Sequence, residues 1–262
     1  MKKTVIFILA IAMTFSFLTF FVSAGTQEYS WYCAHVRGHL QPTVGKEFSF
    51  LDTCASYYID TRNSAPDAKE KVIYLTFDAG YENGNVSRVL DVLYEEEVSA
   101  AFFILGNLIE RNEELVRRMA KEGHTVCNHT LRHKNMAAFD DAAFLEELHA
   151  LEALYEERIG AKLSSYYRPP EGRFSKENLL CAAQNGYKTV FWSFAYPDWD
   201  NGRQMSSESA KRIILENVHN GEVMLLHPTS KTNAEILSDV IQTLKSEGYR
   251  FGTLDELTRE DA

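Results

Sequence analysis

The residues of this sequence that could do chemistry are carboxylates, histidines and one arginine that follow apolar runs. Six of them stand at or just past the ends of such runs: Asp78, His129, His133, Arg168, Asp198 and His227. An apolar, β-branched run is typical of a buried strand, and parallel α/β folds place their chemistry at the carboxyl ends of strands. Aspartate suits general base catalysis, and histidine can donate a proton near neutral pH. We therefore expect the six side chains to share one site.

Several of these residues also have a simpler interpretation. Asp78 would serve equally as a turn or cap residue ahead of the next helix. His129 and His133 are four residues apart, so they project to one side and suit a divalent transition metal such as zinc, but chance also supplies such pairs. Arg168 precedes two prolines and could pair with a carboxylate and keep it ionised, or stay solvated on a rigid turn.

The stretch from residue 191 to 200 ends a predicted strand in aromatic rings and a carboxylate. Its Asp198 would orient His227 and raise the pKa of that imidazole. Aromatic rings around an open site suit the faces of sugars. They also suit a core, and we expect at least half of these rings to be core.

The elements that must position these residues are apolar, strand-like runs with helical stretches between them. The runs cover about 72–77, 99–105, 124–127, 165–167, 189–194, 222–226 and 249–253. Apolar stripes at helical spacing separate them, and we assign these stripes to the core. The alternation predicts an α/β fold, a distorted (β/α) barrel of about seven parallel strands. Residues 71–258 form this domain, and residues 25–70 form an irregular N-terminal extension that packs aromatic side chains on it.

Charge and the N-terminal residues indicate where the chain acts. The sequence has 262 residues and a formal net charge of −10, which argues against nucleic acid as a partner. Lys2 and Lys3 precede an uncharged apolar run, and small residues end at Ala24. We predict that residues 1–24 are a signal peptide cleaved after Ala24, or an uncleaved anchor that tethers the chain to a membrane. In either case the rest of the chain is exported.

The four cysteines are Cys33, Cys54, Cys127 and Cys181. No C-x-x-C pair occurs, so a structural zinc knuckle is not expected. Export permits disulfides, and the pair we predict is Cys33 with Cys54, because both lie in the same loop-rich segment. Cys127 and Cys181 are expected to be buried thiols.

Five ordered motifs carry a resemblance to a known family. They are Thr76-Phe77-Asp78-Ala79-Gly80, His129-Thr130-Leu131-Arg132-His133, Arg168-Pro169-Pro170, Asp198-Trp199 and Leu225-Leu226-His227. Over residues 70–257 the chain resembles the polysaccharide deacetylase family, the metal-dependent carbohydrate N- and O-deacetylases. The resemblance implies a distorted (β/α) barrel, in agreement with the strand count.

The resemblance also implies a role for each polar residue. Asp78 is the general base that activates water, and Arg168 fixes it. His227 is the general acid that protonates the leaving amine, with Asp198 as its partner. The expected ligands of a divalent metal such as zinc are His129 and His133, and the expected substrate contacts are Tyr81, Pro169, Pro170, Trp199 and Leu226.

One branch of the family is similar in finer detail, at residues 76–84, 168–172, 191–195 and 225–229. These stretches resemble the delta-lactam-biosynthetic de-N-acetylases of spore-forming bacteria. The implied substrate is N-acetylmuramic acid in peptidoglycan strands whose stem peptide has been removed. The freed amine would then close onto the lactyl carboxylate to give the muramic δ-lactam of the spore cortex. The chain would act in the cell wall or in the forespore intermembrane space.

One position departs from the family pattern. The second aspartate of the first motif, which the family uses as the third metal ligand, is Ala79 here. Catalytic zinc usually takes three protein ligands, so two histidines alone should bind it weakly. The gap could be filled by Glu82, Asn83 or Asn128, or by water, or the metal could be loosely held or dispensable.

Two other functions are compatible with the same residues. The substrate could instead be the N-acetylglucosamine of peptidoglycan, or chitin oligomers. Alternatively the chain could be a non-catalytic glycan-binding spore protein, which the loss of the aspartate at position 79 favours and the retained Asp78, Arg168 and His227 oppose.

Overall fold

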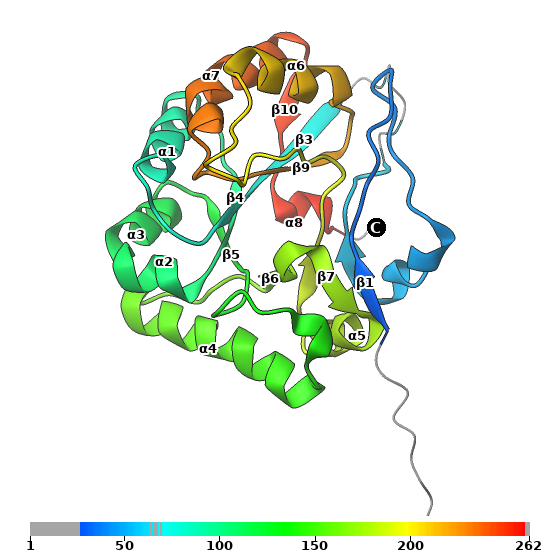
Figure 1. Ribbon diagram of the computed structural model, residues 1–262, viewed down its shortest axis with the longest axis vertical. Helices are drawn as coiled ribbons and strands as arrows, with labels where there is room; N and C mark the ends of the chain where they lie inside the picture. Colours follow the sequence, from blue (N-terminus) through cyan, green and yellow to red (C-terminus); the bar gives the residue numbers. More distant parts are fainter. Residues whose placement is uncertain (1–26, 63, 65–67, 69, 260–262) are drawn as a thin grey trace, which may run out of the picture.

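The computed structural model of the protein describes residues 27–62, 64, 68 and 70–259, and Figure 1 shows its chain course. Its centre is an eight-stranded sheet in the order β10-β3-β4-β5-β6-β8-β2, with β9 paired to β3, and every pairing is parallel. The strands are β2 (Ser56–Tyr57), β3 (Lys71–Ala79), β4 (Ala101–Ile104), β5 (Thr125–Asn128), β6 (Tyr166–Tyr167), β8 (Lys188–Val190), β9 (Glu222–Leu226) and β10 (Tyr249–Phe251).

All seven predicted strands are therefore confirmed. The eighth, β2, comes from the segment that we expected to be an irregular extension. Of the strand predicted at 189–194, only the first two residues belong to strand β8, which ends at Val190. Beyond it the chain still bonds to β9, because Ser193 N–H donates to the carbonyl of Val223 (3.0 Å) and Leu225 N–H donates to that of Phe194 (2.9 Å). These bonds curl the sheet round into the barrel that the sequence predicts.

Helices cover the outer side of the curled sheet (Figure 1). They are α1 (Val86–Glu95), α2 (Gly106–Arg111), α3 (Glu113–Lys121), α4 (Asp141–Ile159), α5 (Lys176–Gln184), α6 (Ser207–Asn217) and α7 (Lys231–Ser246). The short α8 (Leu254–Leu257) lies instead near the centre of the view, and its leucines pack in the second apolar cluster with Tyr74 and Phe103. Short 3-10 turns lie at Lys46–Phe48, Leu51–Thr53, Met136–Ala138 and Pro170–Gly172. The apolar stripes of these helices are buried as expected; on α1 they are Val86, Val89, Leu90 and Leu93.

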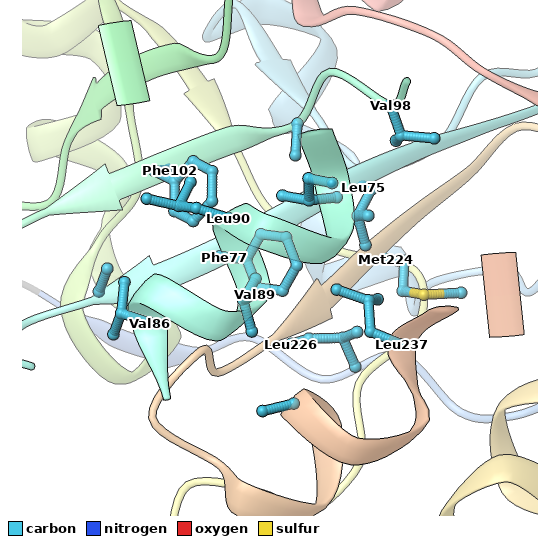
Figure 2. Packing of buried hydrophobic residues seen from close by; sticks show 14 of the residues in the cluster. Leu75, Phe77, Val86, Val89, Leu90, Val98, Phe102, Met224, Leu226 and Leu237 are labelled. Atoms are coloured by element: carbon cyan, nitrogen blue, oxygen red, sulfur yellow. The ribbon is translucent and has the colours of Figure 1, made fainter. Parts of the chain in front are cut away.

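The side chains of β3 alternate between two packing environments. Leu75 and Phe77 belong to the larger apolar cluster, and Figure 2 shows them among residues of α1, with Leu237 of α7 close by. Tyr74 belongs to a second cluster. Successive side chains of a strand point to opposite faces, so Thr76 and Asp78 lie on the same face as Tyr74. Burying a Leu or Phe side chain stabilises the fold by about 1.5–3 kcal/mol, so this alternation fixes the register that presents Asp78.

The N-terminal segment packs on the side of the barrel away from α1–α4 (Figure 1, blue). Its β1 (Glu28–Ser30) pairs antiparallel with β7 (Arg173–Ser175), and its β2 pairs with β8. Trp31 and Phe48 of this segment form an apolar cluster with Phe174 and Phe191 of the main domain.

The predicted disulfide between Cys33 and Cys54 is wrong. Both residues are free thiols, buried in the aromatic cluster of the N-terminal segment. Burial raises the pKa of the Cys33 thiol to about 12, so this side chain is protonated at neutral pH and packs as a small apolar group. Cys127 and Cys181 are buried thiols, as expected.

The predicted signal peptide or anchor lies outside the described residues. Within the part of the chain that the structure describes, no helix is both long and apolar enough to span a membrane.

Candidate active site

Arg168 is fully buried and holds Asp78 at the end of β3. Its Nη1 donates to Asp78 Oδ1 (2.8 Å) and its Nη2 donates to Thr76 Oγ1 (2.9 Å), while its Nε donates to the Val190 carbonyl (2.9 Å). The guanidinium also lies over the ring of Phe103, 4.0 Å from its centroid. A buried charge is stable only when it is paired and hydrogen-bonded, and these contacts satisfy both conditions.

Asp78 is kept ionised by this arrangement. Burial raises the pKa of its carboxyl, but the neighbouring His129, Arg168 and His227 together hold that pKa below its ordinary value. Burial lowers the pKa of His129 to about 4, so this imidazole is neutral at pH 7. Arg168 is therefore the permanent positive charge beside Asp78, and Asp78 Oδ2 remains available to accept a proton.

A tight loop after β5 presents the two candidate metal ligands. Thr130 and His133 have left-handed backbones (φ 73° and 56°), and Thr130 Oγ1 accepts a hydrogen bond from His133 N–H (3.0 Å). The Nδ1–H of His129 donates to the Arg168 carbonyl (2.9 Å), which leaves Nε2 facing Asp78 Oδ2 at 3.5 Å. The rings of His129 and His133 lie edge to face, with centroids 5.0 Å apart. Both imidazoles thus reach the same pocket.

His129 and His133 would together offer two imidazole donors to a divalent cation such as zinc. Within residues 27–62, 64, 68 and 70–259, no group of three or more His, Cys, Asp or Glu side chains is arranged to hold a metal ion. Ala79 is fully buried and packs in the apolar cluster with Phe77. A two-ligand site binds zinc more weakly than the usual three-ligand catalytic site.

The structure does not bring Glu82, Asn83 or Asn128 to the pocket as a replacement ligand. Glu82 Oε2 accepts from the N–H of Val86 (2.9 Å), so it caps the start of α1. Asn83 donates to the Thr229 carbonyl (2.8 Å). Asn128 is fully buried and bonds within the loop after β5 and to α4.

Asp198 and His227 form the second pair of the site. The Nδ1–H of His227 donates to Asp198 Oδ1 (2.7 Å), and the backbone N–H of His227 donates to Oδ2 (2.7 Å). Asn233 Nδ2 also donates to Oδ2 (2.6 Å). Burial lowers the pKa of His227, but the charge and hydrogen bond of Asp198 raise it above its ordinary value. His227 therefore carries a proton that Nε2 can donate near neutral pH.

Both pairs open into one pocket of about 710 Å³, within the range of sites that hold small ligands. Its lining consists of Asp78, Gly80, Tyr81, Leu105, His129, His133, Glu171, Trp192, Ala195, Tyr196, Trp199, Leu225, His227 and Thr229. Trp199 is 61% exposed and Tyr81 is 45% exposed, so both rings are open to a ligand. Aromatic rings of this kind stack on apolar sugar faces.

The structure separates the predicted substrate contacts into two groups. Tyr81 and Trp199 line the pocket. Pro169 and Pro170 are buried and do not line it; they hold the chain after Arg168. Leu226 does not line it either, because β9 turns this side chain into the apolar cluster of Figure 2, and Leu225 lines the pocket instead.

Sequence reasoning missed several residues that shape the site. Thr76 and Asn233 hold Arg168 and Asp198, but each stands in an ordinary strand or helix-start context. The Ser230 side chain caps α7 by accepting from Asn233 N–H (3.1 Å), which brings Asn233 to the site. Trp192 and Tyr196 belong to the aromatic stretch at residues 191–200, but the sequence did not single them out as pocket residues. Three of the five rings in this stretch are buried (Phe191, Phe194 and Tyr196), so the expectation that at least half are core is confirmed.

Comparisons with known proteins agree with this geometry. Residues 65–190 match the family model described as "Polysaccharide deacetylase". The peptidoglycan-N-acetylmuramic acid deacetylase PdaA of Bacillus subtilis is 35% identical over 235 residues, 89% of this chain and 87% of PdaA. A solved structure of B. subtilis PdaA, a family 4 carbohydrate esterase, has a TM-score of 0.82 at 35% identity and covers 88% of this chain and 97% of its own.

A peptidoglycan-N-acetylglucosamine deacetylase of Bacillus cereus is 32% identical over 195 residues, 72% of this chain and 89% of its own.

A curled β/α barrel whose strand ends bring together a carboxylate–arginine pair and a carboxylate–histidine pair defines a hydrolase site. The chain belongs to the polysaccharide deacetylase family, carbohydrate esterase family 4, and is an enzyme of the carbohydrate deacetylase class.

Proposed function

We propose that the protein removes the N-acetyl group from N-acetylmuramic acid in peptidoglycan whose stem peptides have been cut away. The observation that carries this proposal is the presence of Asp78 and His227 in one pocket, each with its own charged partner. The likeness to PdaA over 89% of the chain supports the choice of sugar. The substrate partner is thus a peptidoglycan glycan strand outside the cytoplasm.

In the first step Asp78 acts on water. Its Oδ1 is occupied by Arg168, so the free Oδ2 takes a proton from a water molecule while the water oxygen attacks the acetyl carbonyl carbon. The carbonyl π bond breaks and its electron pair moves to oxygen, which gives a tetrahedral oxyanion. Asp78 is ready for this role at neutral pH because its pKa is held below the ordinary value.

In the second step His227 acts on the leaving group. The oxyanion reforms its carbonyl and the C–N bond breaks, while His227 Nε2–H gives its proton to the amine nitrogen. The products are acetate and a free amine on the sugar. Asp198 holds the imidazole in the orientation that points Nε2 away from the protein and toward the pocket.

The divalent cation belongs to the same proposal. His129 and His133 would hold it, and zinc suits imidazole donors. Such an ion would polarise the acetyl carbonyl. Calorimetric titration with zinc should give weak binding to the wild-type chain and no binding to His133→Gln. Equal binding to the two proteins would contradict this assignment.

The product has a further use in this proposal. The freed amine and the lactyl carboxylate sit on one sugar, so they can condense with loss of water to a six-membered lactam, the muramic δ-lactam of the spore cortex. Such a role would place the protein in the cell wall or in the forespore intermembrane space, in a sporulating cell.

Acetate release from two substrates tests the choice of sugar. We expect release from peptide-free peptidoglycan and little from chitin oligomers, with Asp78→Asn as the inactive blank. Release from chitin oligomers alone would overturn the muramic assignment. Unchanged glycan binding and an unchanged sporulation role in Asp78→Asn would instead favour a non-catalytic glycan-binding protein.

One observation favours N-acetylglucosamine as a second candidate substrate. Among the described residues that line the pocket, two are carboxylates, Asp78 and Glu171, and none is a lysine or arginine. A lactyl carboxylate would therefore meet no lysine or arginine side chain at the pocket wall. N-acetylglucosamine has no such charge, so its oligomers would not meet the repulsion from Glu171.

A further inference from the structure

Trp31, in the N-terminal segment, joins two loops of the main domain that line the pocket. It is 5% exposed. Its backbone N–H donates to the carbonyl of Gly172 (2.8 Å), and its indole Nε1–H donates to the carbonyl of Trp192 (2.9 Å). Gly172 directly follows Glu171, and Glu171 and Trp192 both line the pocket. One buried residue thus bonds to both of these wall segments, to one through its backbone and to the other through its side chain.

The packing around Trp31 leaves little freedom to these segments. A Cβ at Gly172 would lie 2.9 Å from Trp192 Cη2 and 3.0 Å from Trp31 Cβ, so only glycine allows this approach. Glu171 and Gly172 both have left-handed backbones (φ 56° and 65°). The indole of Trp31 stacks on Phe191, with centroids 4.5 Å apart and planes at 22°. The relative position of the two walls therefore depends on Trp31, whose backbone holds the Gly172 segment and whose indole holds the Trp192 segment.

The Asp78–Arg168 pair and the Asp198–His227 pair are held mainly by contacts that do not involve Trp31. Asp198 is fixed by Asn233 and by the backbone N–H of His227, and Arg168 is fixed by Thr76 and the Val190 carbonyl. One longer bond, from Arg168 Nη2 to the Phe191 carbonyl (3.2 Å), reaches the residue on which Trp31 stacks. A change at Trp31 therefore moves the pocket wall much more than it moves Asp78 or His227.

We propose that Trp31 is a positioning residue that sets the spacing between the Glu171 and Trp192 walls, and through it the affinity for the glycan strand. This inference rests on the proposed function, since it takes the pocket to be the glycan site. It makes the N-terminal segment part of the substrate site, although Trp31 itself does not line the pocket.

The test compares Trp31→Phe with Leu51→Ala in the full chain. Trp31→Phe keeps an aromatic ring but removes the indole N–H. Leu51→Ala opens the same apolar cluster at a residue that does not line the pocket. Loss of one hydrogen bond predicts that Trp31→Phe raises KM for a glycan oligomer about 2- to 10-fold with kcat unchanged. Leu51→Ala should lower the melting temperature and leave KM unchanged.

The outcomes separate this inference from the proposed function. If the wild-type chain released no acetate from any glycan, the proposed function would fail. Glycan affinity measured in the Asp78→Asn background, with and without Trp31→Phe, would then decide the positioning role. Equal affinities would overturn it, and so would a Trp31→Phe enzyme whose KM matches wild type while its melting temperature falls as in Leu51→Ala.

Discussion

The two carboxylates of the site differ in their partners, and the roles that we propose for them follow from this difference. Asp78 is bonded to a guanidinium that stays charged at any working pH, so it is kept as a free base. Asp198 is 2% exposed and accepts three hydrogen bonds, two from His227 and one from Asn233, so it has no free role as a base. Its effect is to keep a proton on His227. In the proposed mechanism the same residue type thus serves as the base at one strand end and supports the acid at another.

Removing the Asp78 carboxylate should have the largest effect on activity. Asp78→Asn keeps the shape of the side chain but cannot accept the proton of water. We expect kcat to fall by about 10²- to 10⁴-fold, measured as acetate release. If kcat fell less in Asp78→Asn than in Asp198→Asn, the proposed roles would be contradicted, because the main proton acceptor would then be Asp198.

Removing the charge of Arg168 should affect both activity and stability. Arg168→Met leaves the nearly buried Asp78 without its cation. Breaking a buried pair in this way costs about 3–5 kcal/mol of folding free energy, measured by denaturant unfolding. The pKa of Asp78 should rise, so the acid limb of the pH–rate profile should move to higher pH. An unchanged acid limb in folded Arg168→Met would show that Arg168 does not keep Asp78 ionised.

Removing the charge of Asp198 should affect the pH dependence of stability. The pKa of His227 is raised above 6.5 in the folded protein. Its contribution to stability is therefore fully present below pH 6.5 and is lost as the pH rises through the raised pKa. Melting temperatures of wild type and Asp198→Asn should differ most on the acid side of this window. A difference that grows with rising pH would contradict the pairing.

The smallest effect is expected at the pocket rim. Glu171 is exposed and pairs with Arg173 at 3.4 Å, and Arg173 also binds Glu28. Glu171→Gln should raise kcat/KM on peptide-free peptidoglycan by up to about five-fold, since exposed charges act weakly. The neutral chitin oligomers are the control. A similar rise on both substrates would show that the charge of Glu171 does not select between them.

The sequence predicted the barrel because its strands are short apolar runs, and three of them, β3, β6 and β9, have a polar residue of the site directly beside their carboxyl ends. The same alternation explains why Asp78, Arg168 and His227 could be recognised. Two wrong predictions concern residues that lie close together in the sequence but whose surroundings only the fold decides. Leu226 and Leu225 are adjacent and equally apolar, and only the pleat of β9 decides which one faces the pocket. The Cys33–Cys54 disulfide was inferred from closeness in sequence, whereas the aromatic cluster holds both as free thiols.

The contacts that sequence could not predict link distant segments. Trp31 is 161 residues from Trp192, and Asn233 is 35 residues from Asp198. A tryptophan in an irregular segment and an asparagine at a helix start have many ordinary uses, so neither predicts a role in a site. Only the folded chain shows that the N-terminal segment supplies β2 and supports the pocket wall.

The division of roles between Asp78 and His227 is tested most directly by the pH dependence of kcat/KM. Acetate release by the wild-type chain should rise as Asp78 ionises, below the usual range for an aspartate, and fall as His227 loses its proton above pH 6.5. In Asp198→Asn only the basic limb should move, to lower pH. A profile in which Asp198→Asn moves the acid limb, or leaves both limbs in place, would contradict the assignment of base and acid.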